Sequence, residues 1–159
     1  MYYSELLDRA NSEMDPEQRI LYVSAFIVSQ YSLNDQRTKK PFNPLLGETF
    51  ELVDRERGFE FLSEQVCHHP PISAVHCRSK NFEIIDNSKN KTTFTGSSLK
   101  FVPQSNGKIT LQRLKDSYSF SKCTMTLNNL MMGKLYLENT GQVRIVCKKL
   151  NTQALLNFK

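Results

Sequence analysis

Apolar side chains recur every three or four residues in the first part of the chain, and this period predicts helices. A short helix is expected at residues 2–10. A second helix is expected from Pro16 to about Tyr31, because Asp15 can cap its first turn and proline suits the first helical position. The apolar residues of this second helix fall on one face, which is typical of a helix that packs on a core.

From Glu48 onward apolar and polar residues alternate with a period of two, which predicts β-strands. Phe50 and Leu52 form one such pair, and Phe59 and Phe61 form the next after a turn. A loop is expected at 87–91 and a tight turn at 139–141. The other expected strands are 72–76, 81–86, 92–102, 108–115, 118–122, 124–130, 134–137, 142–148 and 154–158.

This succession of strands predicts the fold class. No strand alternates with a helix, so a parallel α/β fold is not expected. An antiparallel meander of about ten strands hides its edges best by curling towards a barrel. A barrel with more strands than its side chains can fill leaves a cavity for a small apolar ligand. The sequence therefore predicts a mainly β protein with N-terminal helices.

Length and charge narrow the function classes. A chain of 159 residues makes one domain, and no apolar run approaches the ~20 residues of a membrane span. No signal peptide is visible, and the four cysteines lack a disulfide-framework spacing, so a reduced cytosolic protein is expected. The net charge of +5 favours acidic partners, although solubility alone explains it equally well. No nucleic-acid module is recognised, and no nucleic-acid partner is expected.

Two adjacent histidines, His68 and His69, precede two prolines. Proline fixes φ and lacks a backbone N–H, and the residue before it avoids the α region, so a stiff extended segment is expected. Neighbours in an extended chain point to opposite faces, so the backbone must bend if both imidazoles serve one ligand. We expect this segment to bind an anionic group rather than to form a turn. A packing or surface role is the commoner alternative for a lone histidine.

Residues 64–71, Glu-Gln-Val-Cys-His-His-Pro-Pro, resemble the signature octapeptide of the oxysterol-binding protein family, which has serine in place of Cys67. Residues 40–51, Lys-Pro-Phe-Asn-Pro-Leu-Leu-Gly-Glu-Thr-Phe-Glu, are similar to a second family block, and 133–136 to a looser third. The blocks follow the family's order, so the chain is identified as a member. Asn128 and Tyr136 depart from the histidine and tryptophan that are common in the family.

The resemblance implies that the antiparallel meander forms part of a large incomplete β-barrel with a lipid tunnel. Residues 1–159 are then expected to form a single partial lipid-binding domain. Helices would occupy 1–36, a signature loop 37–47 and an antiparallel sheet 48–159. The family's lid and the C-terminal half of its domain are expected to be absent from this chain.

By the same resemblance, Lys40, His68 and His69 correspond to the family's contacts with the headgroup of phosphatidylinositol 4-phosphate, and Asn43 is a further donor. Lys40 offers a point charge on a segment that is stiffened by proline. The alternative is that Lys40 is an ordinary solvated lysine on the surface. A nearby phosphate favours protonated imidazole, so headgroup affinity should rise as pH falls through the neutral range.

Gln30 and Tyr31 match a position where sterol-binding members hold the sterol hydroxyl, although both could instead satisfy backbone groups. Apolar residues are also expected to face the lipid tail, with ordinary core packing as an equal alternative. These residues are Ile27, Phe42, Leu45 and Phe50.

The implied function is extraction and exchange of phosphatidylinositol 4-phosphate and a second lipid, sterol or phosphatidylserine, between membranes. A cytoplasmic protein that associates transiently with anionic organelle membranes is expected, with no catalysis, metal or cofactor. The alternative is a phosphoinositide-sensing module without transfer activity. An enzyme that uses His76 and Cys77 with the 67–69 segment lacks the paired spacing of zinc sites and an orienting partner for a cysteine nucleophile.

Overall fold

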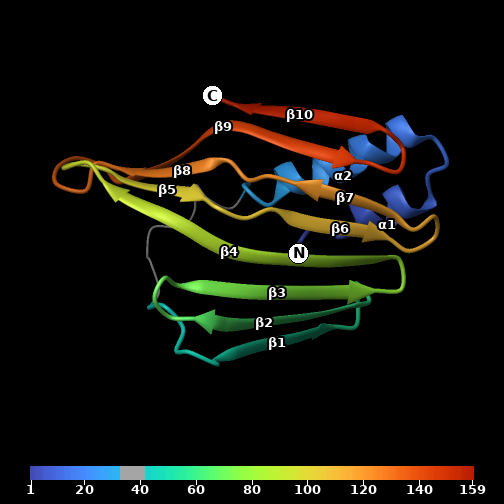
Figure 1. Ribbon diagram of the computed structural model, residues 1–159, viewed down its shortest axis with the longest axis horizontal. Coiled ribbons are helices and arrows are strands. Elements are labelled where there is room, and N and C mark those ends of the chain that lie inside the picture. The colour runs from blue at the N-terminus through green and yellow to red at the C-terminus, as the bar shows by residue number, and fades with distance from the viewer. Residues whose placement is uncertain (33–41) are drawn as a thin grey trace.

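The computed structural model describes residues 1–32 and 42–159. Two helices, α1 (Glu5–Ser12) and α2 (Pro16–Ser29), precede strands that each pair antiparallel with their neighbours (Figure 1). The strands of the described part are β1 (Thr49–Asp54), β2 (Phe59–Cys67), β3 (Ile72–Ser79), β4 (Phe82–Phe94), β5 (Leu99–Pro103), β6 (Gly107–Leu111), β7 (Asp116–Phe120), β8 (Thr124–Asn128), β9 (Tyr136–Cys147) and β10 (Thr152–Phe158).

The start of α2 confirms the predicted cap. The Asp15 carboxylate accepts a hydrogen bond from the backbone N–H of Glu17 at 3.0 Å, and Pro16 occupies the first helical turn. The predicted first helix is also present, although it begins three residues later than expected, at Glu5. No helix in residues 1–32 or 42–159 is long and apolar enough to span a membrane.

The sheet forks between β4 and β9. The first half of β4 pairs with β6 and the second half with β5, so two strand pairs, β6–β7 and β5–β8, lie end to end in this gap. Both pairs rejoin at β9, whose first half pairs with β8 and whose second half pairs with β7 and β10. The described strands form a partial ring, not a closed barrel, with β1 and β10 at its edges (Figure 1).

This topology corrects four sequence expectations. The predicted loop at 87–91 lies inside β4, because Lys89 pairs with Ile72 and Lys91 with Val102, and ladder pairing outweighs the low strand propensity of Asn and Lys. The predicted turn at 139–141 lies inside β9. The predicted strand 92–102 is broken by a turn at Gly96, where φ is +74°. The simple meander ends at β4, since β5 and β6 both pair with it.

One hydrophobic core joins the helices to the sheet. A row of facing residues crosses five strands in register beneath the helices, from Phe61 through Cys77, Ile84 and Ile109 to Tyr118. Helix α1 contacts β4 and β6, and α2 contacts β10. The core therefore fills one end of the sheet and leaves the other end of the same face uncovered by these helices.

A buried ion pair fixes α2 to the sheet. Arg19 and Asp116 are only 2% and 1% exposed, and Arg19 Nη2 lies 3.1 Å from Asp116 Oδ2. Arg19 also donates from Nε to the Tyr118 hydroxyl at 3.3 Å, and Lys149 Nζ lies 2.9 Å from the other Asp116 oxygen. One carboxylate thus connects α2, β7 and the turn before β10.

Candidate functional site

The two adjacent histidines lie together at a tight turn. Residues 68–71 connect β2 to β3, and the His69–Pro70 peptide bond is cis. The expectation of an extended segment instead of a turn is wrong, because antiparallel pairing of β2 with β3 requires the chain to reverse here. The bend brings the two imidazole rings to a centroid distance of 4.6 Å at 64°, and both side chains are exposed.

Gln65 holds this turn from inside, and the sequence reasoning missed it. The side chain is 2% exposed and donates from Nε2 to the Cys67 carbonyl at 3.0 Å. Its Oε1 accepts a hydrogen bond from the Ser73 hydroxyl on β3. A register shift between Gln65 and Cys67 accompanies these bonds. An inward-facing glutamine within an otherwise alternating strand was the signal for this role.

The second signature block ends beside the same glutamine. The backbone N–H of Gln65 donates to the Glu48 carbonyl at 3.0 Å, and the Gly47 N–H donates to the Gln65 carbonyl at 2.9 Å. Gly47 has φ +80°, a conformation that favours glycine. The Glu48 carboxylate accepts from the Leu45 N–H at 2.7 Å and closes the loop. The two signature blocks are therefore hydrogen-bonded neighbours.

The structure describes only one of the two headgroup residues expected from this second block. Lys40 lies outside the described residues. Asn43 lies within them and is exposed. The backbone bonds at Gly47 and Glu48 attach the end of their block to the strand that leads into the histidine turn.

The two residues expected near a sterol hydroxyl have separate partners. Gln30 is exposed, and its amide donates to the Phe26 carbonyl at 3.2 Å. The Tyr31 hydroxyl accepts the Cys123 N–H at 3.4 Å, and its ring lies 4.9 Å from that of Phe158. Burial raises the pKa of Tyr31 above its ordinary value, so the phenol stays neutral at neutral pH. Each of the two side chains hydrogen-bonds to a backbone group, which is the alternative considered for both.

The residues expected to face a lipid tail divide into two groups. Ile27 is buried in the core, whereas Phe42, Leu45 and Phe50 are exposed. Phe50 belongs to an apolar groove of about 370 Å³ on the inner face of β1 and β2. The groove is lined by Met1, Tyr2, Phe50, Leu52, Asp54, Arg57, Phe59 and Phe61.

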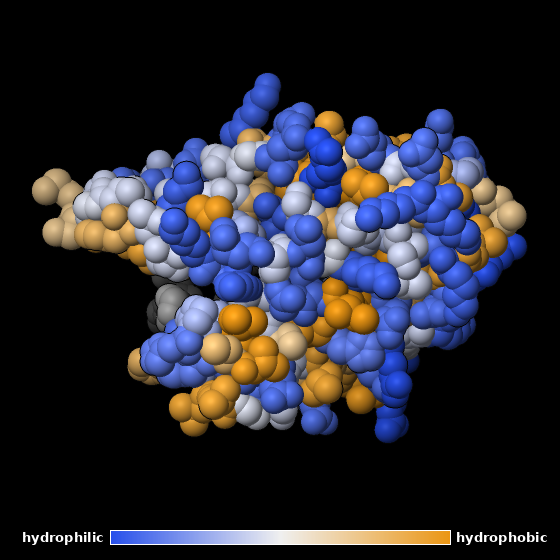
Figure 2. Space-filling model, in the orientation of Figure 1, coloured by the Kyte–Doolittle hydropathy of each residue, from blue (hydrophilic) through white to orange (hydrophobic). Residues whose placement is uncertain are grey.

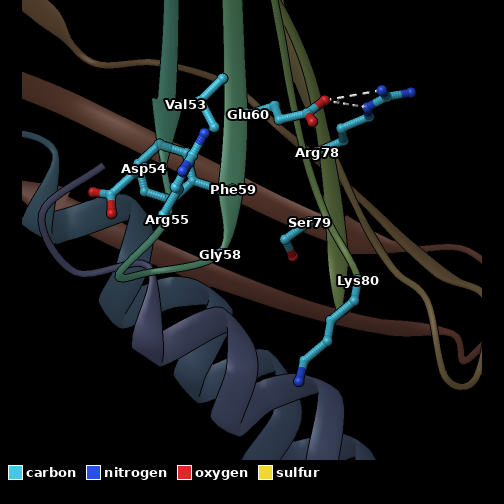
Figure 3. A pocket seen from close by; sticks show the side chains of 9 residues that line it. All are labelled: Val53, Asp54, Arg55, Gly58, Phe59, Glu60, Arg78, Ser79 and Lys80. Atoms are coloured by element: carbon cyan, nitrogen blue, oxygen red, sulfur yellow. Dashed lines mark hydrogen bonds and ion pairs between the residues drawn. The ribbon is translucent and has the colours of Figure 1, made fainter.

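A second pocket, of about 410 Å³, shares Asp54 and Phe59 with this groove and lies between the β1–β2 and β3–β4 turns, at the end of the sheet opposite the histidine turn (Figure 3). Glu60 and Arg78 pair across its rim at 2.9 Å, and Lys80 extends towards the helices. None of the residues predicted for the site lines this pocket.

The residues of the enzyme alternative do not form one cluster. His76 lies on β3 and contacts Glu83 at 2.9 Å on the outer face, while its neighbour Cys77 points into the core. Within residues 1–32 and 42–159, no group of three or more His, Cys, Asp or Glu side chains is placed to hold a metal ion.

The four free thiols differ in accessibility, which gives a testable labelling order. Only Cys67 is half-exposed; Cys77, Cys123 and Cys147 are buried. Burial raises the pKa of Cys77 to about 11 and also raises that of Cys123, so their reactive thiolate forms are scarce. We expect brief alkylation of the native protein, followed by peptide mass spectrometry, to modify Cys67 first. Equal modification of Cys77 would contradict this order.

Comparison with known proteins gives the family. The family model "Oxysterol-binding protein" matches residues 1–159. The chain is 44% identical over 146 residues to mouse oxysterol-binding protein-related protein 6. This match covers 91% of the chain and 15% of that relative. It is 42% identical to human oxysterol-binding protein-related protein 1 over an alignment of 163 residues. This match covers the whole chain and 17% of that relative.

Solved structures match the fold closely. The Osh1 ORD domain in complex with ergosterol has a TM-score of 0.94 and 34% identity, over 99% of this chain and 39% of that one. The Osh3 ORD of Saccharomyces cerevisiae in complex with PI(4)P has a TM-score of 0.90 and 30% identity, over 99% of this chain and 42% of that one. The chain thus spans less than half of these structures and about one sixth of the curated relatives. The family match covers every residue, and the chain belongs to the oxysterol-binding protein family.

Proposed function

We propose that this chain binds the headgroup of phosphatidylinositol 4-phosphate at the His68–His69 turn and contributes to exchanging that lipid for a second one between membranes. The observation that carries the proposal is the pairing of two exposed imidazoles at a turn anchored by buried Gln65. Binding and transfer are non-covalent in this proposal, with no catalytic step and no cofactor.

The chemistry of the turn suits a phosphorylated headgroup. Protonated imidazoles donate charge-assisted hydrogen bonds, which are stronger than neutral ones. Donors that are fixed before the ligand arrives cost less to order on binding. Gln65 and the two prolines provide this fixation for His68 and His69. Lys40 and Asn43 are proposed as further donors from the block whose end is bonded to Gln65.

The identity of the lipids is supported by the related structures. PI(4)P is the ligand of the Osh3 ORD, and ergosterol that of the Osh1 ORD. We propose sterol as the second lipid, with phosphatidylserine as the other choice, and Gln30 and Tyr31 as sterol contacts. Anionic membranes reached from the cytoplasm would be the donor and acceptor, and residues 1–159 would act as part of a single lipid-binding domain.

A phosphoinositide sensor without transfer activity is the second candidate. In the described residues the inner face of β1 is open, and Phe50 and Leu52 remain exposed. Exposing an acyl chain to water costs about 0.8 kcal/mol for each CH₂ group, so extraction requires a closed enclosure. The open inner face is the observation that supports sensing, whereas transfer in our proposal requires that residues 1–159 act within a domain that covers this face.

Transfer of labelled phosphatidylinositol 4-phosphate between two vesicle populations separates the two functions. A transfer protein moves the label at a rate proportional to its concentration, and lipid co-purifies with it in mass spectra. A sensor binds phosphatidylinositol 4-phosphate vesicles yet leaves the label in the donor population. Failure to prefer vesicles with this lipid over matched vesicles without it would refute both.

A further inference from the structure

Two loops form a projecting tip at one end of the sheet. The turn between β4 and β5 and the loop between β8 and β9 are joined by a hydrogen bond from the Leu130 N–H to the Ser97 carbonyl at 2.9 Å. The Ser98 hydroxyl donates to the Asn128 side chain at 2.8 Å and adds a second link. Strand β4 continues five residues beyond Lys89, which pairs with β3, so the tip extends about 17 Å past that pairing.

The tip exposes large apolar side chains. Phe94, Met131 and Met132 are 62%, 78% and 87% exposed. None of the three belongs to the hydrophobic core. Figure 2 shows apolar colour at the far left, where these loops project in Figure 1. Contiguous exposed apolar side chains on a projecting loop are typical of an interaction surface.

Three exposed lysines lie on or beside this apolar tip. Lys91 and Lys100 lie on the same face of the β4–β5 pair, and Lys134 follows Met132 by two residues. All three are exposed, and none has an acidic partner within the described ranges. Residues 91–100 and 128–136 contain no Asp or Glu, and Glu138, the first carboxylate after them, accepts a hydrogen bond from the Asn128 amide at 3.5 Å. The tip is therefore complementary to a negatively charged partner.

We propose that this tip docks on an anionic lipid bilayer: Phe94, Met131 and Met132 enter the interface, and Lys91, Lys100 and Lys134 contact lipid phosphates. Apolar side chains flanked by cations provide the two signals that stable membrane association requires. The tip is separate from the histidine turn but lies at the same end of the sheet, so docking would turn His68 and His69 towards the membrane (Figure 1).

The chain has no tryptophan, so one introduced tryptophan reports insertion directly. In a Met132→Trp variant we expect the emission to shift to the blue when phosphatidylcholine vesicles with about 30% phosphatidylserine are added. Brominated acyl chains should quench it. Met14→Trp, exposed at the opposite end, is the matched control and should not respond. No shift for Met132→Trp, or equal shifts for both variants, would overturn the proposal.

Vesicle affinity tests the charge contribution without any phosphoinositide. Each basic residue near an anionic surface raises affinity about fivefold, so Lys91→Gln/Lys100→Gln/Lys134→Gln should lose about 100-fold. Met131→Ser/Met132→Ser should lose at least about tenfold. Lys80→Gln/Lys115→Gln/Lys148→Gln removes the same charge at the far end and should retain affinity.

These tests separate docking from headgroup recognition. A His68→Ala/His69→Ala variant should bind the phosphatidylserine vesicles like the parent, even if it no longer binds phosphatidylinositol 4-phosphate. Equal losses of vesicle affinity in the two lysine triple variants would show that only net charge matters, and would refute docking through the tip. A tryptophan at 132 that is already blue-shifted without vesicles would show that protein covers the tip, which also refutes docking.

Discussion

His68→Ala/His69→Ala is expected to lower extraction of phosphatidylinositol 4-phosphate from vesicles at least about 100-fold. Each imidazole is proposed to donate a hydrogen bond to a charged phosphate, and such bonds contribute about 1.5–3 kcal/mol each. Losing two therefore costs about 3 kcal/mol or more, and 1.4 kcal/mol corresponds to about tenfold in affinity. A fluorescent headgroup-binding probe on donor vesicles measures the lipid removed.

The third histidine supplies the matched control for this variant. His76 contacts Glu83 on the outer face of the sheet, away from the turn, so His76→Ala should extract like the parent. The double variant should keep its fold, because both replaced side chains are exposed and Gln65 still anchors the turn. Extraction by the double variant at the parent's rate would refute the headgroup assignment.

Arg19→Leu is expected to lower the free energy of unfolding by about 3–5 kcal/mol, because it leaves the buried Asp116 carboxylate with one partner fewer. The lost bond to the Tyr118 hydroxyl adds to this cost. Urea unfolding followed by circular dichroism gives the midpoint and slope.

Two further variants identify the cause of this loss. Arg19→Leu/Asp116→Leu removes the isolated buried charge and should be more stable than Arg19→Leu alone. Arg78→Leu breaks the exposed pair with Glu60 and should leave the unfolding midpoint unchanged. If Arg19→Leu unfolds at the same urea concentration as the parent, the buried pair does not contribute to stability.

Local patterns predicted the fold where local interactions determine it. Asp15 and Pro16 specified the start of α2, and alternation located β2 and β3. The fork in the sheet has no local signal, because the choice between β5 and β6 as partners of β4 depends on distant strands. The same pairing turned the Asn- and Lys-rich 87–91 segment into strand, against its intrinsic propensity.

The sequence indicated candidate residues for the site but not the contacts that hold them in place. The signature blocks pointed to His68 and His69, and the need for a bend between them followed from the opposite directions of neighbouring side chains in an extended chain. The nature of that bend did not, because a turn is imposed by the pairing of β2 with β3. Gln65 was missed because its two partners, Cys67 and Ser73, come together only in the folded hairpin.

Titration of the three histidines by NMR with water-soluble, short-chain phosphatidylinositol 4-phosphate tests headgroup binding most directly. The imidazole resonances of His68 and His69 should shift together and saturably, while those of His76 stay in place, and Lys40→Ala should greatly weaken the response. Unchanged His68 and His69 resonances at saturating lipid, or shifts confined to His76, would contradict recognition of the headgroup at this turn.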